Sequence, residues 1–354
     1  MKRFVYVILL VLSSCGKQTQ DQYGGYREVN FDFGDFSDTK ELKSKKYLFK
    51  EILVPHHVLF KSGKLIVSSL SSSNQLFIID AGTMELEFSK GRYGQGPDEI
   101  FEPWRMDKGL NDSTFWVYSI SGKEFSEFSL IDNSYQPKRK IKQSGDFHQS
   151  LSMNWLGKDQ IIAYQNVGTS RFSVFDPTGL RIRNHGYWNT SGDSSISENA
   201  SFILSTINQG SIGVSSDAKY VVLAQVSTDS FEIIDLSTEE ITKVIGPIKQ
   251  ELKYSIEFDG RQNFPALNPD MKNGYNQVFA NKDEIFLVYI GRSDEEISKS
   301  GIISNDVFVF DFNGVPIIHY KLDCSIKALT VDADSRKIYG VTFEKEPGIA
   351  VFEY

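Results

Sequence analysis

The stretch HVLFKSGKLIVSSLSSSNQLFIID, residues 57–80, holds an apolar segment and two runs rich in β-branched and aromatic residues, separated by polar turns. Such runs, bounded by Gly, Ser, Asn and Lys, are typical of short antiparallel strands. The same order of apolar segment, turn, β-rich run, turn and β-rich run recurs along the chain. The further copies are residues 104–132, 151–176, 211–235, 277–311 and 326–354.

The spacing of these six copies indicates one kind of fold. Their second strands are expected to begin near Leu65, Phe115, Ile161, Tyr220, Ile285 and Ile338, at successive intervals of 50, 46, 59, 65 and 53 residues. A four-stranded propeller blade takes about 40–50 residues, so each interval fits one blade, with insertions in the fourth and fifth. The sequence therefore predicts an all-β fold, a six-bladed β-propeller of four-stranded antiparallel blades over residues 45–354.

The two ends of the chain suggest how the ring closes. The sixth copy stops after its third strand, at Tyr354, so its sheet would lack an outer strand. An exposed sheet edge is normally paired or covered. We expect KKYLFKEILV (45–54) to supply that N-terminal strand, and YREVNFDF (26–33) is the alternative.

The first residues carry an export signal. Lys2 and Arg3 precede nine apolar residues, Phe4–Leu12, a run too short to span a bilayer. Small residues and Cys15 follow in a pattern that resembles the lipobox of bacterial lipoproteins. We predict a signal peptide over residues 1–14, lipidation of Cys15, and a flexible tether to residue 44.

An anchored chain would stay on its membrane. No aspartate follows Cys15, which favours the outer membrane over the inner, with either leaflet open. The net charge is −8, and removal of Lys2 and Arg3 makes it −10, which argues against nucleic acid as a partner. With Cys15 lipidated, Cys324 has no disulfide partner, and we expect it to be a small buried side chain.

Two further motifs strengthen a family resemblance. The lipobox, the six repeats, GRYGQGPDEI (91–100) and YIGR (289–292) together resemble the TolB-like six-bladed propeller lipoproteins of Bacteroidota-type bacteria, the group labelled BF3164-like. The resemblance implies the fold and an envelope location. It brings no assigned catalytic residues, so any activity must be argued from a site.

The glycine motif does not have the spacing of a nucleotide-binding loop. Gly91, Gly94 and Gly96 read GxxGxG, without a following helix or a GKS/GKT sequence. We predict a crossover between blades 1 and 2. The alternative is a backbone nest that binds an anionic group with help from Arg92, Tyr93 and Arg105.

Catalytic and metal motifs are weak. The five histidines are scattered, and the adjacent His56 and His57 would point to opposite faces of a strand. No GxSxG or EF-hand sequence occurs. The inner strands HVLF, WRMD, SMNW, SIGV, QVFA and KALTV are mostly apolar or neutral, so we predict no metal and no cofactor.

Two long insertions are the remaining candidate sites. Residues 185–202 and 259–275 exceed what blade connections need, and binding residues are often placed on such loops. Aromatic, Arg and Asn side chains there suit a glycan, peptide or protein ligand. Alternatively, they only pack the loops against the blades. Together with YIGR, the insertions give the candidate residues Tyr187, Trp188, Arg261, Phe264, Tyr275 and Arg292.

These features favour a non-enzymatic envelope lipoprotein whose propeller binds a ligand or an envelope protein. The alternative is a propeller enzyme, a lyase, lactonase or hydrolase, with its site at the mouth of the central channel. Such an enzyme would place several acids or histidines close together in the channel.

Overall fold

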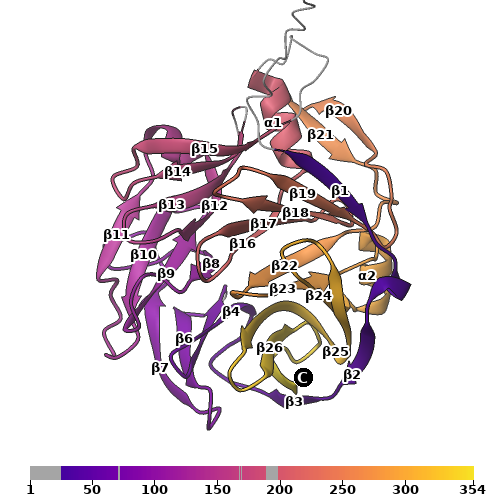
Figure 1. Ribbon diagram of the computed structural model, residues 1–354. Helices are drawn as coiled ribbons and strands as arrows, with labels where there is room; N and C mark the ends of the chain where they lie inside the picture. The colour runs from indigo at the N-terminus through magenta and orange to yellow at the C-terminus, as the bar shows by residue number, and fades with distance from the viewer. Residues whose placement is uncertain (1–24, 71, 167, 169, 189–197) are drawn as a thin grey trace, which may run out of the picture.

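Antiparallel sheets surround a central axis in the computed structural model of this protein (Figure 1). The structure describes residues 25–70, 72–166, 168, 170–188 and 198–354. The predicted signal peptide and Cys15 lie outside these residues. The sheets form six blades, which confirms the predicted fold class.

The first three blades are separate four-stranded sheets. Blade 1 comprises β4 (Pro55–Lys61), β5 (Lys64–Ser69), β6 (Asn74–Asp80) and β7 (Leu86–Arg92). Blade 2 comprises β8 (Pro103–Asp107), β9 (Thr114–Ser119), β10 (Glu124–Ser129) and β11 (Arg139–Lys142). Blade 3 comprises β12 (Ser150–Trp155), β13 (Ile161–Gln165), β14 (Ser170–Phe175) and β15 (Arg181–Tyr187).

The last three blades carry additions. Blade 4 comprises β16 (Gly210–Val214), β17 (Tyr220–Gln225), β18 (Ser230–Asp235) and β19 (Ile241–Ile245). Blade 5 comprises β22 (Tyr275–Ala280), β23 (Ile285–Tyr289), β24 (Ser304–Phe310) and the first half of β25 (Pro316–Asp332). The 17-residue strand β25 then continues as the inner strand of blade 6, followed by β26 (Lys337–Thr342) and β27 (Ile349–Glu353).

A strand from the start of the chain closes the ring. β3 (Ser44–Tyr47) pairs antiparallel with β27, with Tyr47 opposite Ile349 and Ser44 opposite Phe352. Blade 6 therefore obtains its outer strand from the segment predicted from residues 45–54, and the alternative, residues 26–33, is wrong. Because one sheet holds strands from both ends of the chain, opening the ring would break this pairing.

The segment before β3 is folded too. β1 (Tyr26–Asn30) pairs parallel with β19, and β2 (Asp38–Leu42) pairs parallel with β25. A short 3-10 helix, η1 (Phe33–Asp35), separates them. Phe31, Phe36 and Leu42 are buried against blades 4–6. The folded part of the chain therefore begins no later than Tyr26 rather than at residue 45, because these three side chains complete the cores beneath them.

The connections contain the remaining elements. α1 (Glu198–Ile207) precedes blade 4, and the hairpin of β20 (Tyr254–Phe258) and β21 (Asn263–Leu267) links blades 4 and 5 beside α1 (Figure 1). α2 (Asp294–Ser300) lies between β23 and β24, and the 3-10 helix η2 (Gly145–Gln149) precedes β12. Neither described α-helix is long and apolar enough to cross a membrane.

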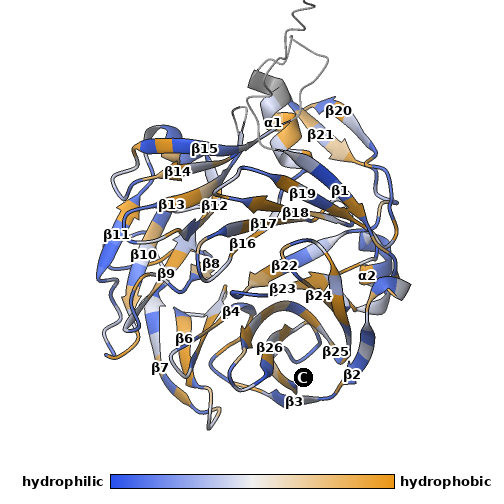
Figure 2. Ribbon diagram, viewed as in Figure 1, coloured by the Kyte–Doolittle hydropathy of each residue, from blue (hydrophilic) through white to orange (hydrophobic). Residues whose placement is uncertain are grey.

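The core is divided among the blade interfaces. Six apolar clusters are found in the described residues, and each combines side chains of two neighbouring blades. In Figure 2 the strands β17 and β18 are strongly hydrophobic, whereas the outer strand β15 is mostly hydrophilic. Burial of apolar area between blades is the main favourable term that holds the ring together.

Cys324 packs against the blade 5–6 cluster, and burial raises the pKa of its thiol.

Candidate ligand site in the central channel

The innermost strands enclose a cavity on the propeller axis. β4, β8, β12, β16, β22 and the second half of β25 adjoin one another around the ring. The cavity has a volume of about 570 Å³ and is lined by residues from all six strands. It reaches the turns that follow β8, β12 and β16, where Lys108, Gly157 and Ser216 border it.

A shared irregularity places side chains in this cavity. Register shifts occur at the same point in five inner strands, at Pro55/His57, Pro103/Arg105, Ser150/Ser152, Tyr275/Gln277 and Ile326/Ala328. A β-bulge bends its strand and re-aims the side chain that follows. His57, Arg105, Ser152 and Gln277, the first paired residues after the shift, all line the cavity.

Gln277 determines which ring nitrogen of His57 carries the proton. The Oε1 of Gln277 accepts a hydrogen bond from the backbone N–H of Leu329 at 2.6 Å, so its amide NH₂ faces His57 and donates to Nε2 at 2.8 Å. Burial and the nearby Arg105 hold the pKa of His57 well below its ordinary value. The ring is therefore neutral at pH 7 and carries its proton on Nδ1.

No acidic residue of the described chain pairs with Arg105. Its Nε is buried without a hydrogen bond, and burial lowers the pKa of the guanidinium to about 10. None of the ion pairs between described residues includes it. Arg105 as a whole is half-buried. A guanidinium with a buried nitrogen is normally paired with a carboxylate, so this arrangement is unusual.

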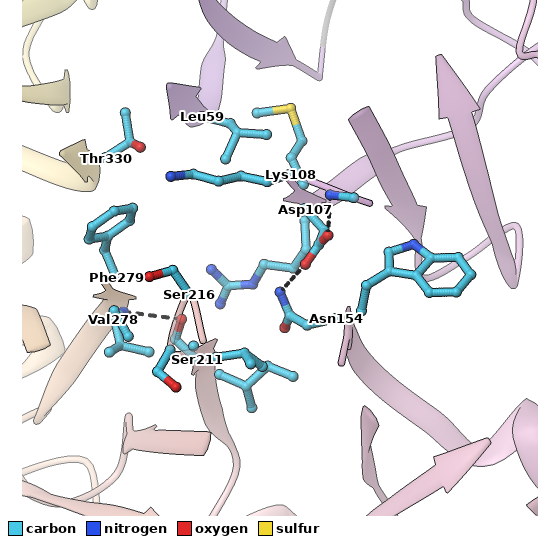
Figure 3. A pocket seen from close by; sticks show the side chains of 18 of the residues that line it. Leu59, Asp107, Lys108, Asn154, Ser211, Ser216, Val278, Phe279 and Thr330 are labelled. Carbon is cyan, nitrogen blue, oxygen red and sulfur yellow. Dashed lines mark hydrogen bonds between the residues drawn. The ribbon is translucent and has the colours of Figure 1, made fainter. Parts of the chain in front are cut away.

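Both carboxylate oxygens of the nearby Asp107 already accept hydrogen bonds. Figure 3 shows Asn154 pointing toward Asp107, whose Oδ2 accepts from Asn154 Nδ2 at 2.7 Å while Oδ1 accepts from the N–H of Gly109 at 2.5 Å. Burial raises the pKa of the Asp107 carboxyl, although the hydrogen bonds from Gly109 and Asn154 and the charge of Lys61 act in the opposite direction. Lys61 donates to the carbonyls of Asn111 and Thr114 at 2.5 and 2.8 Å, and so holds the adjacent turn.

A second cation lies at the border of the cavity. Lys108 extends toward Phe279 in Figure 3, and its Nζ lies 5.3 Å from the centre of that ring. Burial lowers the pKa of the Lys108 ammonium. The channel is thus more polar and more cationic than the neutral lining expected from the strand sequences, because Arg105 and Lys108 both line it.

The glycine motif forms a crossover, as predicted, and its turn is occupied by the chain itself. Glu99 Oε2 accepts from the N–H of Gly96 at 2.9 Å. Arg92 borders a shallow hollow at this turn, and Tyr93 is half exposed beside Phe101. Arg105 lines the channel instead, so the expected pair of Arg92 and Arg105 on one patch does not form.

Two of the insertion aromatics are core residues. Trp188 is 7% exposed and packs under Arg171, with the guanidinium carbon 4.4 Å from the ring centre. Tyr275 is fully buried, and its hydroxyl donates to the carbonyl of Gly246 at 3.2 Å. These two side chains pack the insertions against the blades, which is the alternative to a role in ligand binding.

The other candidates are dispersed. Arg292 donates through Nη1 to the carbonyls of Ile290 and Ile303, and so braces the β23–β24 connection. Arg261 is exposed in the β20–β21 turn, Phe264 is half-buried in β21, and Tyr187 ends β15 half-buried. The hairpin itself exposes Tyr254, Ile256 and Phe258. None of these residues lines the channel cavity.

The adjacent His56 and His57 have different contacts. His56 packs on Trp104 with ring centres 4.9 Å apart, while His57 faces Gln277, so the two rings point in different directions as expected. In the part of the chain that the structure describes, no group of three His, Cys, Asp or Glu side chains could hold a metal ion.

His57 and Ser152 were not among the predicted site residues. Their signal is present in the repeats, because a polar residue occupies nearly the same place at the start of most inner strands. Single copies look neutral, and the pattern becomes visible only when the copies are aligned.

The comparisons with known proteins agree with the architecture. A family model described as "TolB-like 6-blade propeller-like" matches residues 32–334. The search of curated proteins finds no match.

Solved structures share the fold at low sequence identity. A member of the DUF4221 family from Bacteroides vulgatus is 12% identical with a TM-score of 0.56, covering 88% of this chain and 96% of that one. A Bacteroides fragilis protein described as exported is 11% identical with a TM-score of 0.55, covering 92% and 98%. The Cps50 (Swd1) β-propeller domain of Myceliophthora thermophila is 10% identical with a TM-score of 0.50, covering 88% and 99%. At these identities the likeness concerns the fold alone.

Proposed function

Since the chain belongs to the TolB-like family of six-bladed propellers, we propose that it is an envelope lipoprotein that binds a small ligand in its central channel without reacting with it. The propeller would be a rigid receptor held at the membrane by a lipid on Cys15. The outer membrane is the proposed location, because no aspartate follows Cys15.

One observation carries the binding role. The cavity of about 570 Å³ is lined by all six inner strands. Ligand pockets usually measure about 300–1,000 Å³ and combine apolar walls with a few placed polar groups. Met106, Ile212 and Val278 supply apolar wall here, and His57, Arg105 and Ser152 supply polar groups.

Native mass spectrometry tests the binding role. The full chain is purified in detergent from its own envelope, and the small molecules that it releases are identified. The blocking variant is Ser216→Trp, since Ser216 is exposed at the cavity border in the turn after β16. Thr238→Trp is the matched control, because it lies exposed in the turn before β19 of the same blade and outside the cavity.

We expect wild type and Thr238→Trp to carry the same bound mass and Ser216→Trp to lose it. A mass that persists in Ser216→Trp contradicts a channel site, and a wild-type protein that carries no small molecule contradicts the binding role.

The anchor is tested separately. Labelling of cells with an alkyne fatty acid should mark the wild-type protein, and Cys15→Ala should lose both the label and the membrane association. Equal labelling of the two proteins contradicts lipidation at Cys15.

A further inference from the structure

Among the described residues, four buried polar atoms of cavity-lining side chains lack a hydrogen-bond partner, namely His57 Nδ1, Arg105 Nε, Ser152 Oγ and Trp155 Nε1. The first three belong to the residues that follow the register shifts of their strands. Their residues lie on β4, β8 and β12, which follow one another around the channel, and all three line the cavity. His57 is 6% exposed and Ser152 is 5% exposed. Buried polar groups are nearly always hydrogen-bonded. Unpaired polar groups on three neighbouring strands of one cavity therefore indicate a missing ligand.

All three groups can donate a hydrogen bond. The guanidinium of Arg105 has donors only, and a serine hydroxyl turns its proton toward any acceptor. The contact with Gln277 at 2.8 Å occupies Nε2 of His57, which leaves the proton on Nδ1. A ligand that satisfies this set must present acceptor oxygens.

The charges select among acceptors. No carboxylate among the described residues pairs with Arg105, and both oxygens of Asp107 already accept hydrogen bonds from Gly109 and Asn154. The other acid at the cavity, Asp217, forms an ion pair with Lys219 at 3.1 Å. Lys108 adds a second cation, which meets the face of Phe279 rather than an acid. A neutral acceptor would leave Arg105 uncompensated, whereas an anion would pair with it.

We propose that the channel binds a small anion whose carboxylate or phosphate oxygens accept hydrogen bonds from Arg105, His57 Nδ1 and Ser152 Oγ. A guanidinium holds either group through two parallel N–H donors, and such charge-assisted bonds are the strong ones. Lys108 adds attraction at the border of the cavity. This inference rests on the channel as the ligand site and names the chemical class of the ligand.

Titration calorimetry on the full chain in detergent tests the anion. The probes are inorganic phosphate and succinate, which separate the two kinds of anionic group, and glucose is the neutral probe. The key variant is Arg105→Gln. Arg92→Gln is the matched control, since Arg92 is exposed at the end of β7 and does not line the channel.

We expect at least one anion to bind wild type and Arg92→Gln equally, and Arg105→Gln to bind it at least about tenfold more weakly, which is the loss of one charge-assisted contact. Ser152→Ala should weaken binding by a few fold. Equal affinity in Arg105→Gln, or no saturable binding of either anion, overturns the inference. The envelope-purified protein could instead release a neutral molecule that Ser216→Trp does not carry. That result would support the binding role of the channel and contradict only the anionic nature of the ligand.

Thermal unfolding keeps the test independent of folding defects. In buffer without the anion, Arg105→Met should melt at or above the wild-type temperature, because it removes an unpaired, partly buried charge. Adding the anion that binds should raise the wild-type midpoint and leave that of Arg105→Met unchanged. An equal rise in both proteins overturns the assignment to Arg105.

Discussion

Glu99 Oε2 lies 2.9 Å from the backbone nitrogen of Gly96 and places a carboxylate of the chain itself inside the glycine turn. Lys140 of blade 2 holds the same turn, since its Nζ donates to the carbonyl of Glu99 at 2.6 Å. Backbone N–H groups in such turns bind anions. The turn at residues 91–100 therefore binds an internal anion, and Gly94 and Gly96 are required because Glu99 lies so close to them, whereas a Cβ on Gly91 would meet Ile100 and Leu76.

Gly94→Ala tests this role. Gly94 has φ +154°, and a Cβ there would lie 1.9 Å from Glu99 Oε2. We expect a loss of about 1–3 kcal/mol in the free energy of unfolding, from backbone strain and displacement of the carboxylate. Gly34→Ala is the control, since a Cβ there meets nothing within 4 Å. Urea unfolding compares the two variants, and equal losses would contradict the role of Glu99.

The fold could be predicted because the repeat carries its own spacing. Each observed second strand begins within one residue of its predicted start, as for Leu65 against Lys64 and Ile338 against Lys337. The parallel strands β1 and β2 could not be predicted in this way. Their partners lie more than 200 residues away, and residues 26–30 show little burial pattern of their own.

The closing strand gives the second prediction. Replacing SKKY (44–47) with GSGS should weaken the pairing with β27 and open the ring, because this pairing is what completes blade 6. We expect cooperative melting at least about 10 °C lower, given that about 1 kcal/mol shifts the midpoint of a large domain by about 2–4 °C.

Replacing β1 (Tyr26–Asn30) with a flexible sequence is the comparison. β1 adds a fifth strand to a blade that is already complete, so its loss should shift the midpoint less. A larger effect from β1 than from β3 would contradict the closure mechanism.

The candidate site was only partly predictable. The sequence identified Arg105 as a candidate, but placed it on a patch with Arg92. The crossover motif at residues 91–100 does not show that the strand after it, β8, directs Arg105 into the channel. Trp188 and Tyr275 look like loop aromatics in the sequence, and only packing decides that they turn inward. The channel donors depend on bulges, which alter the side-chain direction that strict alternation predicts.

A buried ion pair joins blades 3 and 4. Arg171 Nε lies 2.5 Å from Glu232 Oε2, its Nη2 donates to Oε1 at 2.9 Å, and both side chains are buried. Glu232→Gln should cost about 3–5 kcal/mol of unfolding free energy, because it leaves the Arg171 charge uncompensated above Trp188.

The same change at an exposed pair is the control. Glu295 pairs with Lys299 on the surface of α2, and Glu295→Gln should change stability little. The double variant Arg171→Met/Glu232→Leu should recover part of the loss, since it removes both charges. A double variant as unstable as Glu232→Gln would show that packing, and not the unpaired charge, dominates.

The pH dependence of stability gives the last prediction. Burial, with contributions from Arg105 and Lys327, lowers the pKa of His56 from 6.5 to about 4. Between these values the unfolded chain binds the proton and the folded chain does not, so folding loses stability as the pH falls from 6.5 to 4. The loss from His56 is about 3 kcal/mol at most, and the lowered pKa of His57 adds to it in the same direction.

His56→Phe should keep the contact with Trp104 and flatten part of this slope. Urea unfolding at pH 7 and pH 4.5 measures it, with His148→Phe as a control because His148 is exposed in η2. Carboxylates such as Asp80, whose pKa is lowered to about 2 by Lys64 and the backbone of its turn, lose their contribution mainly below this window. A slope in His56→Phe equal to that of wild type would mean that the His56 ring is protonated in the folded protein near its ordinary pKa.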